Sequence, residues 1–386
     1  MTKTLVACTY EADNQQVAVE QIVSGLKLEG NLLKHSIGII SCHYEFVLSG
    51  VVQAICDALP FDVVGSVSSA ISACNNSDML LMSIMVITSD DIEFVKILTE
   101  PIAEAADTAI ANSYKKSAKQ GQKPALILAY APFIPQNVGD EYIDVISEVS
   151  GGAPCFGSLA ADGTLYFSDS YTIFNGKHYT DRMVMVLAYG SISPKFYVAH
   201  ISPDKVLPKT ATITKSDRHI IMELDKRPVI SYFEDLNLTN VGSTMFDMAL
   251  LPFMLDYKDG TPSVAKTFVL MTPDGYALCA GAVPEGCSLN VAMTDADDII
   301  VTTNKFADDI FADIENASGL LIYSCIARSM ALGNEQFREM NLIEKKLSGR
   351  LNYMMAYCGG EMCPTAESEG SHSNRFHNNT IIACLF

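Results

Sequence analysis

The chain has 386 residues, of which 49% are hydrophobic and 18% are charged, and it carries a formal net charge of −19 at pH 7. A chain of this length and composition is expected to form two well-buried domains and excludes a largely disordered protein. The acidic balance argues against nucleic acid and anionic membranes as partners, because both attract clustered Lys and Arg.

Cysteine usage and the apolar runs favour the cytoplasm. The eleven cysteines are an odd number, and most lie inside apolar stretches, as Cys8 and Cys384 do. Paired disulfides are therefore not expected, and a reducing compartment is favoured. The apolar stretch at the amino terminus is too short for a signal peptide, and the longest apolar run, residues 79–87, is too short to cross a bilayer.

Strand-like and helix-like segments alternate through the first half of the chain. Residues 5–9 and 37–42 predict short apolar strands. Helical spacing follows each of them, with Asn14 as the expected cap of the first helix. The strand at 62–65 runs into the small-residue sequence GSVSS, and residues 79–87 are apolar throughout, which predicts a central strand covered on both faces.

The alternation continues with a helix whose apolar stripe spans residues 102–110, a strand at 125–130 and a helix from Gly139. From Tyr166 the pattern turns to antiparallel sheet, with Asn175-Gly176 as a hairpin turn. A second hairpin is expected around the sequence TPDG near residue 273, and helical spacing returns near the carboxyl terminus. We find no internal repeat in the sequence.

These elements predict an α/β fold with two lobes, in which helices pack on mixed sheets and antiparallel hairpins fill the second half of each lobe. Residues 202–215, which contain two prolines, are expected to connect the lobes. We therefore divide the chain into domains at 1–205 and 206–386.

Two segments near the carboxyl terminus place polar groups at the ends of apolar strands. Residues 321–328 read LIYSCIAR, and residues 357–380 contain YCGGEMCPT and then NRFHNNT. A guanidinium, a carboxylate, thiols and an imidazole are thus offered where rigid strands end, which is where ligand sites tend to be built.

Together with GSVSS at 65–69 and FGSLAADG at 156–163, these motifs resemble the FIST family of bacterial sensory domains, which has an amino-terminal and a carboxyl-terminal part. The resemblance implies a non-catalytic small-molecule sensor, with amino acids or related compounds as ligands. This chain leaves no length for an output module, so a separate signalling partner, such as a histidine kinase, is expected. The resemblance also implies an alternative, a haem-binding nitric-oxide sensor that regulates a histidine kinase.

Arg328 and Glu361 are the main candidates for ligand binding. A guanidinium can hold a ligand carboxylate through two parallel hydrogen bonds, and the carboxylate that follows Gly359 and Gly360 can accept from a ligand amine. This pair would match an amino acid. The alternatives are structural: an ion pair for Arg328, with Glu361 as one possible partner, and capping of backbone amides for Glu361.

Further candidates for the ligand site are Cys325, Asn374, His377 and Asn378 in the carboxyl-terminal part. Ser66 and Asp162 are the candidates in the amino-terminal part, where turn geometry and capping are an equal alternative. No phosphate-binding or dinucleotide-binding motif is present.

Three other uses of the cysteines and histidines stay open. Cys325 and His377 have the residue types of a nucleophile and its base. Cys358, Cys363, His372 and His377 show a spacing that mimics a zinc site, although its middle interval is short, and we predict no metal. No cofactor is predicted, but haem is possible, with His200 or His377 as an axial ligand and without a CxxCH attachment motif.

Overall fold

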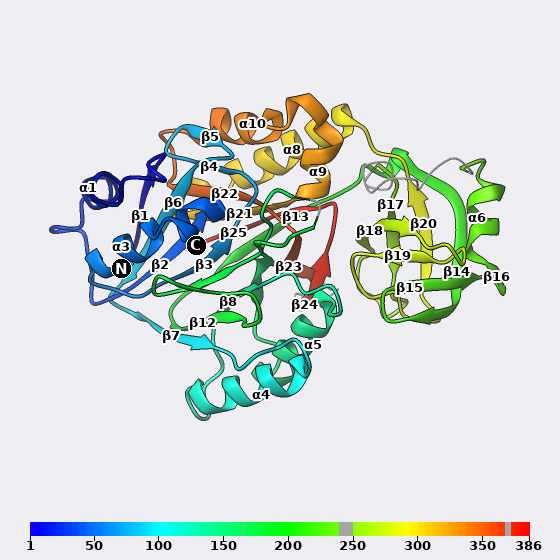
Figure 1. The fold of residues 1–386 in the computed structure, drawn as a ribbon, viewed down its shortest axis with the longest axis horizontal. Helices are drawn as coiled ribbons and strands as arrows, with labels where there is room; N and C mark the ends of the chain where they lie inside the picture. Colours follow the sequence, from blue (N-terminus) through cyan, green and yellow to red (C-terminus); the bar gives the residue numbers. More distant parts are fainter. Residues whose placement is uncertain (165, 239–249, 367–371) are drawn as a thin grey trace.

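The structure is a computed structural model that describes residues 1–164, 166–238, 250–366 and 372–386. It has a larger lobe of mixed sheets with helices packed on them and a smaller lobe built on one sheet (Figure 1). The predicted two-lobed α/β fold is confirmed. The predicted strand at 79–87 is β6 (Met82–Ser89), which lies between two other strands and is buried along its whole length.

The larger lobe consists of three consecutive units with the same strand pairing. In each unit the last strand pairs antiparallel with the first and the second strands, and the second strand pairs parallel with the third. In this order (first, second, third, last), the strands are β1 (Thr2–Thr9), β2 (His35–Cys42), β3 (Val63–Val67) and β6; β7 (Ile92–Leu98), β8 (Leu126–Ala131), β9 (Cys155–Leu159) and β12 (Val184–Gly190); and β13 (Lys195–Ala199), β21 (Leu320–Cys325), β22 (Tyr353–Cys358) and β25 (Ile381–Leu385).

A hairpin between the third and last strands of each unit extends the sheet of another unit. It pairs there with that unit's third strand, so the exchange closes a ring of three six-stranded sheets. Because each edge strand finds its hydrogen-bond partners in another unit, the three units must assemble together. The hairpins are β4 (Ile71–Ala73) with β5 (Asn76–Asp78), β10 (Thr172–Phe174) with β11 (Lys177–Tyr179), and β23 (Gly360–Ala366) with β24 (His372–His377).

The structure thus contains a threefold repeat of topology that the sequence does not display. Gly65 and Gly157 are equivalent positions in β3 and β9, and both need glycine for the same reason. A Cβ atom would lie 1.9 Å from the carbonyl oxygen of Ile40 at the first position and 1.8 Å from that of Ala129 at the second. Close approach of neighbouring backbones therefore explains the glycine at position 65 of GSVSS and at position 157 of FGSLAADG.

Helices cover the outer faces of the three sheets, while the inner faces share one core. Asn14 caps the first helix as predicted, because its side chain accepts a hydrogen bond from the backbone N–H of Val17 at 3.1 Å. The shared core draws on all three sheets and includes Tyr130 and Tyr323. The helices are α1 (Gln15–Leu26), α2 (Tyr44–Leu48), α3 (Val51–Ala58), α4 (Ala106–Ser117), α5 (Gly139–Ser150), α8 (Ala296–Phe311), α9 (Ile326–Leu332) and α10 (Arg338–Leu347).

The smaller lobe is inserted between β13 and α8 and has its own core around Phe253 and Phe268. The predicted boundary between residues 205 and 206 lies where the chain enters this lobe, and the assignment of two domains stays a prediction. Its elements are β14 (Val206–Asp217), β15 (Ile220–Leu224), β16 (Arg227–Pro228), α6 (Val229–Asp235), β17 (Pro252–Asp256), β18 (Val264–Met271), β19 (Ala277–Cys279) and β20 (Ser288–Ala292).

A buried ion pair joins the two lobes. Lys266 on β18 donates to Asp140 Oδ1 at 2.7 Å and to the backbone carbonyl of Phe376 at 2.9 Å. The other carboxylate oxygen of Asp140 accepts from the backbone N–H of Ala282 at 2.8 Å. These contacts hold the smaller lobe against α5 and β24.

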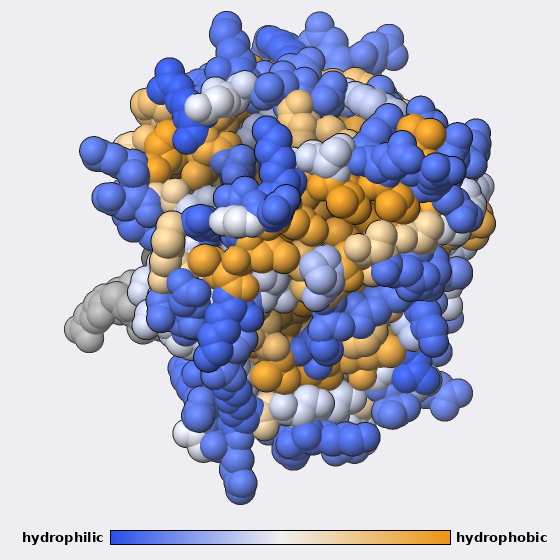
Figure 2. Space-filling model, turned by 90° about the vertical axis from the view of Figure 1, so that its left-hand side faces the viewer, coloured by the Kyte–Doolittle hydropathy of each residue, from blue (hydrophilic) through white to orange (hydrophobic). Residues whose placement is uncertain are grey.

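Figure 2 shows the face turned away from the smaller lobe, where hydrophobic patches lie among hydrophilic side chains. No helix in the described part of the chain is long and apolar enough to span a membrane. The eleven cysteines all lie within the described residues, and all are free.

Candidate functional site

A cavity of about 550 Å³ lies between the two lobes. Five of the segments that line it follow the second or third strands of the units: Ser69 after β3, Phe133 after β8, Gly163 after β9, Cys325 at the end of β21 and Gly359 after β22. The carboxyl ends of these parallel strands therefore meet at the cavity, which is the usual position of ligand sites in α/β sheets.

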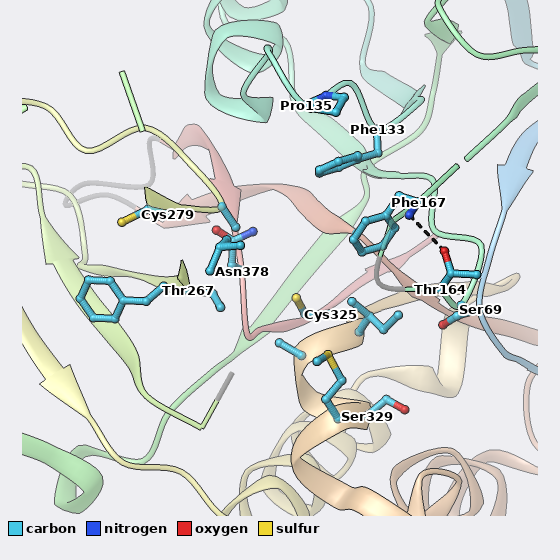
Figure 3. A pocket seen from close by; sticks show the side chains of 18 of the residues that line it. Ser69, Phe133, Pro135, Thr164, Phe167, Thr267, Cys279, Cys325, Ser329 and Asn378 are labelled. Carbon is cyan, nitrogen blue, oxygen red and sulfur yellow. Dashed lines mark hydrogen bonds between the residues drawn. The ribbon is translucent and has the colours of Figure 1, made fainter. Parts of the chain in front are cut away.

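The larger lobe gives the cavity an aromatic wall. The rings of Phe133 and Phe167 have their centroids 4.7 Å apart with an interplanar angle of 36°. The backbone N–H of Phe167 donates to Thr164 Oγ1 at 3.2 Å, a bond drawn in Figure 3. Further apolar contacts come from Ile326 and Met330 on α9. This wall suits a flat, largely apolar ligand.

The smaller lobe closes the opposite side with strands β18 and β19. Phe268 and Cys279 lie there beside Thr267, and His219 comes from the turn before β15. Among the described residues that line the cavity, none is Lys, Arg, Asp or Glu. The described part of the lining therefore offers no Lys, Arg, Asp or Glu side chain to pair with a charged ligand.

Three side chains in the described lining have buried polar atoms without a hydrogen-bond partner, and one of these atoms is Nδ1 of His219. Asn378, which follows β24, is 1% exposed, and both its Oδ1 and its Nδ2 are unpaired. Thr267 is 8% exposed, and its hydroxyl is unpaired as well. Buried polar atoms in folded proteins are nearly always satisfied by protein, water or ligand, so these three side chains could form hydrogen bonds with a bound molecule.

Cys325 lines the cavity and lies close to the Cys358 thiol and the Glu361 carboxyl, neither of which lines it. Cys325 and Cys358 are register partners on the parallel strands β21 and β22. The Cys358 thiol donates to Glu361 Oε1 at 3.3 Å. Burial raises the pKa of Glu361 well above its ordinary value, although the thiols of Cys358 and Cys325 oppose that shift. Burial and the neighbouring Glu361 also raise the pKa of Cys325, so its thiol is protonated at neutral pH.

Arg328 does not line the cavity. Its guanidinium is fully buried and pairs with Glu339 on α10, with Nε and Nη2 lying 2.9 and 2.7 Å from Oε1. Nη2 also donates to Thr303 Oγ1 at 3.0 Å, and Ser324 donates to Glu339 Oε2 at 2.7 Å. Arg328 thus forms a structural ion pair, which was the alternative given from the sequence, but its partner is Glu339 and not Glu361. The ligand-binding role of Arg328 stays a prediction.

Glu361 is the middle member of a buried polar row across three strands. It pairs in register with Ser158 on β9 and with His377 on β24, so the three side chains share one face of the sheet. Burial lowers the pKa of His377 to about 3. Its Nε2 lies 3.2 Å from the Cys363 carbonyl and must donate, which leaves Nδ1 as an acceptor. That Nδ1, Glu361 Oε2 and Ser158 Oγ have no partner, and neither Glu361 nor His377 lines the cavity.

The other predicted site residues have structural contacts. The Asn374 amide accepts from the backbone N–H of Cys155 at 2.9 Å and donates to Ser147 and to the Ala153 carbonyl. Asp162 accepts three hydrogen bonds within the loop that follows β9.

Ser66 is buried within β3, between β2 and β10. Gly360 leaves no room for a Cβ, which would lie 2.3 Å from the Phe376 ring. Of the candidates taken from the sequence, only Cys325, Gly359 and Asn378 line the cavity.

Several lining residues were missed by the sequence analysis. Phe133 follows a predicted strand, and the rule that sites form at strand ends could have selected it. Thr267 and Cys279 sit within a hairpin of the smaller lobe and carry no local signal that separates them from other strand residues.

The alternatives for metal, haem and nucleophilic chemistry are not tested by this geometry. The described residues contain no cluster of three His, Cys, Asp or Glu side chains that could hold a metal ion, and the side chain of His372 lies outside the described residues. His200 and His377 do not line the cavity, whereas His219 does. Haem therefore stays a prediction.

Two cyanuric acid hydrolases are among the solved structures that are similar to this chain. One is described as "Cyanuric acid hydrolase: evolutionary innovation by structural concatenation"; it is 6% identical, with a TM-score of 0.40, over 100% of this chain and 99% of that one. The other is a cyanuric acid hydrolase from A. caulinodans, 9% identical, with a TM-score of 0.36 and coverages of 100% and 99%. Both are enzymes, which overturns our expectation that this chain is not one, but such a distant likeness carries no argument about a reaction.

No curated protein matches the chain. The FIST N domain matches residues 36–227, and the FIST C domain matches residues 231–364. Such domains are associated with sensory signal transduction. The two matches together cover most of the sequence, in agreement with the motifs around Cys325 and Glu361. The chain therefore belongs to the FIST family.

Proposed function

We propose that this protein is a sensor that binds a small, uncharged ligand in the cavity between its lobes and signals to a separate partner protein. The observation that supports this most is the lining of the cavity. It combines an aromatic wall from the larger lobe with unpaired polar atoms of Asn378, Thr267 and His219, and it has no described side chain of Lys, Arg, Asp or Glu. Sites for small molecules have this composition.

The amino-acid ligand expected from the sequence lacks charged partners among the described residues that line the cavity. Arg328 is occupied by Glu339, and Glu361 does not line the cavity. An amino acid would bring a carboxylate and an ammonium into a site that pairs neither, at a large desolvation cost. We therefore propose an uncharged ligand in place of an amino acid.

The position of the cavity suggests how binding is transmitted. Its lining comes from both lobes, which are joined by the Lys266–Asp140 ion pair and by a hydrogen bond from the Asn378 backbone N–H to the Ala265 carbonyl at 3.0 Å. A ligand that contacts both lobes favours the arrangement in which both contacts form, and it shifts the population of lobe arrangements accordingly. A partner that recognises one arrangement would read this shift.

Filling the cavity tests the proposal. Ser329 on α9 lines the cavity (Figure 3), and Ser329→Trp would occupy it, whereas Ser24→Trp on the exposed side of α1 is the matched control. Native mass spectrometry after incubation with a cell extract should show a small molecule retained by the wild type and by Ser24→Trp but not by Ser329→Trp. Equal retention by all three proteins, or retention by none, would refute binding in this cavity.

A further inference from the structure

The unpaired amide of Asn378 restricts the chemistry of the ligand. The backbone around it is fixed, because its N–H donates to Ala265 and its carbonyl accepts from Thr380 Oγ1 at 2.7 Å. The main chain therefore fixes where the side chain begins, and both polar atoms of that side chain are unpaired although the residue is almost fully buried. In the view of Figure 3, this amide lies across the cavity from the rings of Phe133 and Phe167.

A carboxamide side chain offers one donor and one acceptor side by side. The partner that satisfies both at once has the complementary pair, an N–H next to a C=O, as in a primary amide or a ring amide. Asn reads the adjacent donor and acceptor on the edge of adenine by the same geometry. A single hydroxyl or ether oxygen would leave one of the two atoms of Asn378 unsatisfied, which is costly at a buried site.

The rest of the lining agrees with a flat, neutral ring that carries this group. The Phe133–Phe167 pair offers apolar surface to a planar molecule, and Thr267 adds one hydroxyl to the lining. Carboxylic acids and amines would enter without an ionic partner. We infer that Asn378 is the specificity-determining residue of the cavity and that the ligand is a small, planar, uncharged molecule with a carboxamide or ring amide.

This inference rests on the proposed function, because it names the ligand class of the same cavity. Two probes of nearly equal size and shape test it on the full chain. 2-Pyridone presents N–H next to C=O, whereas 2-methoxypyridine has no donor. We expect the wild type to bind 2-pyridone at least about tenfold more tightly, since one or two hydrogen bonds distinguish the probes. Dissociation constants can be measured by NMR titration.

The variant Asn378→Leu should bind both probes alike. It should unfold at the same temperature as the wild type or higher, because an apolar side chain of similar size replaces an unpaired buried amide. That second measurement separates loss of recognition from loss of folding. Thr267→Val, which removes only the hydroxyl, should keep a preference for 2-pyridone.

Three results would overturn the inference: equal binding of the probes to the wild type, as when water alone satisfies Asn378; a preference that survives in Asn378→Leu; or no binding of 2-pyridone up to its solubility limit. The Ser329→Trp experiment tests the proposed function independently of the ligand class. If Ser329→Trp abolishes retention of a cell-derived ligand while the two probes bind alike, the cavity is a ligand site and only the assigned ligand class is wrong.

Discussion

Replacement of Arg328 by alanine should lower the free energy of unfolding by about 3–5 kcal/mol. The guanidinium is 1% exposed and Glu339 is fully buried. Arg328 donates to Glu339 Oε1 through both Nε and Nη2, and Thr303 Oγ1 donates to the same oxygen at 2.7 Å. Removal of Arg328 leaves a buried carboxylate without its cation, and this uncompensated charge accounts for most of the cost.

Two further variants separate this account from a role in ligand binding. Arg338→Ala removes an arginine whose partners Asp297 and Glu335 are exposed, and it should cost at most about 1 kcal/mol. The double variant Arg328→Met with Glu339→Leu removes both charges, so it should lose less stability than Arg328→Ala alone.

Urea unfolding followed by far-UV circular dichroism measures these differences, because the chain has no tryptophan to serve as a fluorescence probe. A loss of less than 1 kcal/mol in Arg328→Ala would refute the structural role of the ion pair. The single variants Arg328→Met and Glu339→Leu complete the comparison. If the double variant loses as much free energy of unfolding as these two single variants together, the two charges act independently and the structural role of the ion pair is refuted.

Three more variants test the fold and its electrostatics. Lys266→Met leaves Asp140 buried without its cation at the lobe junction, so limited proteolysis should cut between the lobes faster than in the wild type; unchanged cleavage would contradict this. Glu361→Gln should be more stable than the wild type, by a margin that grows from pH 4 to pH 8. Because the pKa of Glu361 is raised in the folded wild type, the folded protein keeps a proton that the unfolded chain releases above about pH 4.5. The wild type therefore loses stability as the pH rises, by about 1.4 kcal/mol for each unit by which the pKa is raised. Thermal unfolding across this pH range measures the margin, and a constant difference would count against it. Gly157→Ala should lower the free energy of unfolding, measured in urea, by about 1–3 kcal/mol or more, because its Cβ would overlap the Ala129 carbonyl. If the variant is as stable as the wild type, β8 and β9 can move apart at little cost.

Much of the secondary structure and part of the site could be predicted from local sequence. Asn14 caps the helix it precedes, and the apolar run at 79–87 marks a central strand, because capping and periodicity act between residues close in the chain. The carboxyl-terminal motifs led to the right family and to Cys325 and Asn378, which do line the cavity. Local patterns report which residues end a strand, and sites form at such ends.

The amino-acid sequence by itself determined the α/β class, the two-lobed organisation and the FIST family of this protein. The tertiary structure alone decided that three units exchange hairpins into a closed ring, that Arg328 pairs with Glu339 in place of Glu361, and that Thr267 of the smaller lobe lines the same cavity as Asn378. The physical reason is that these partners are chosen by strand register and lobe packing. Both depend on contacts between residues far apart in the chain, and local periodicity carries no record of them.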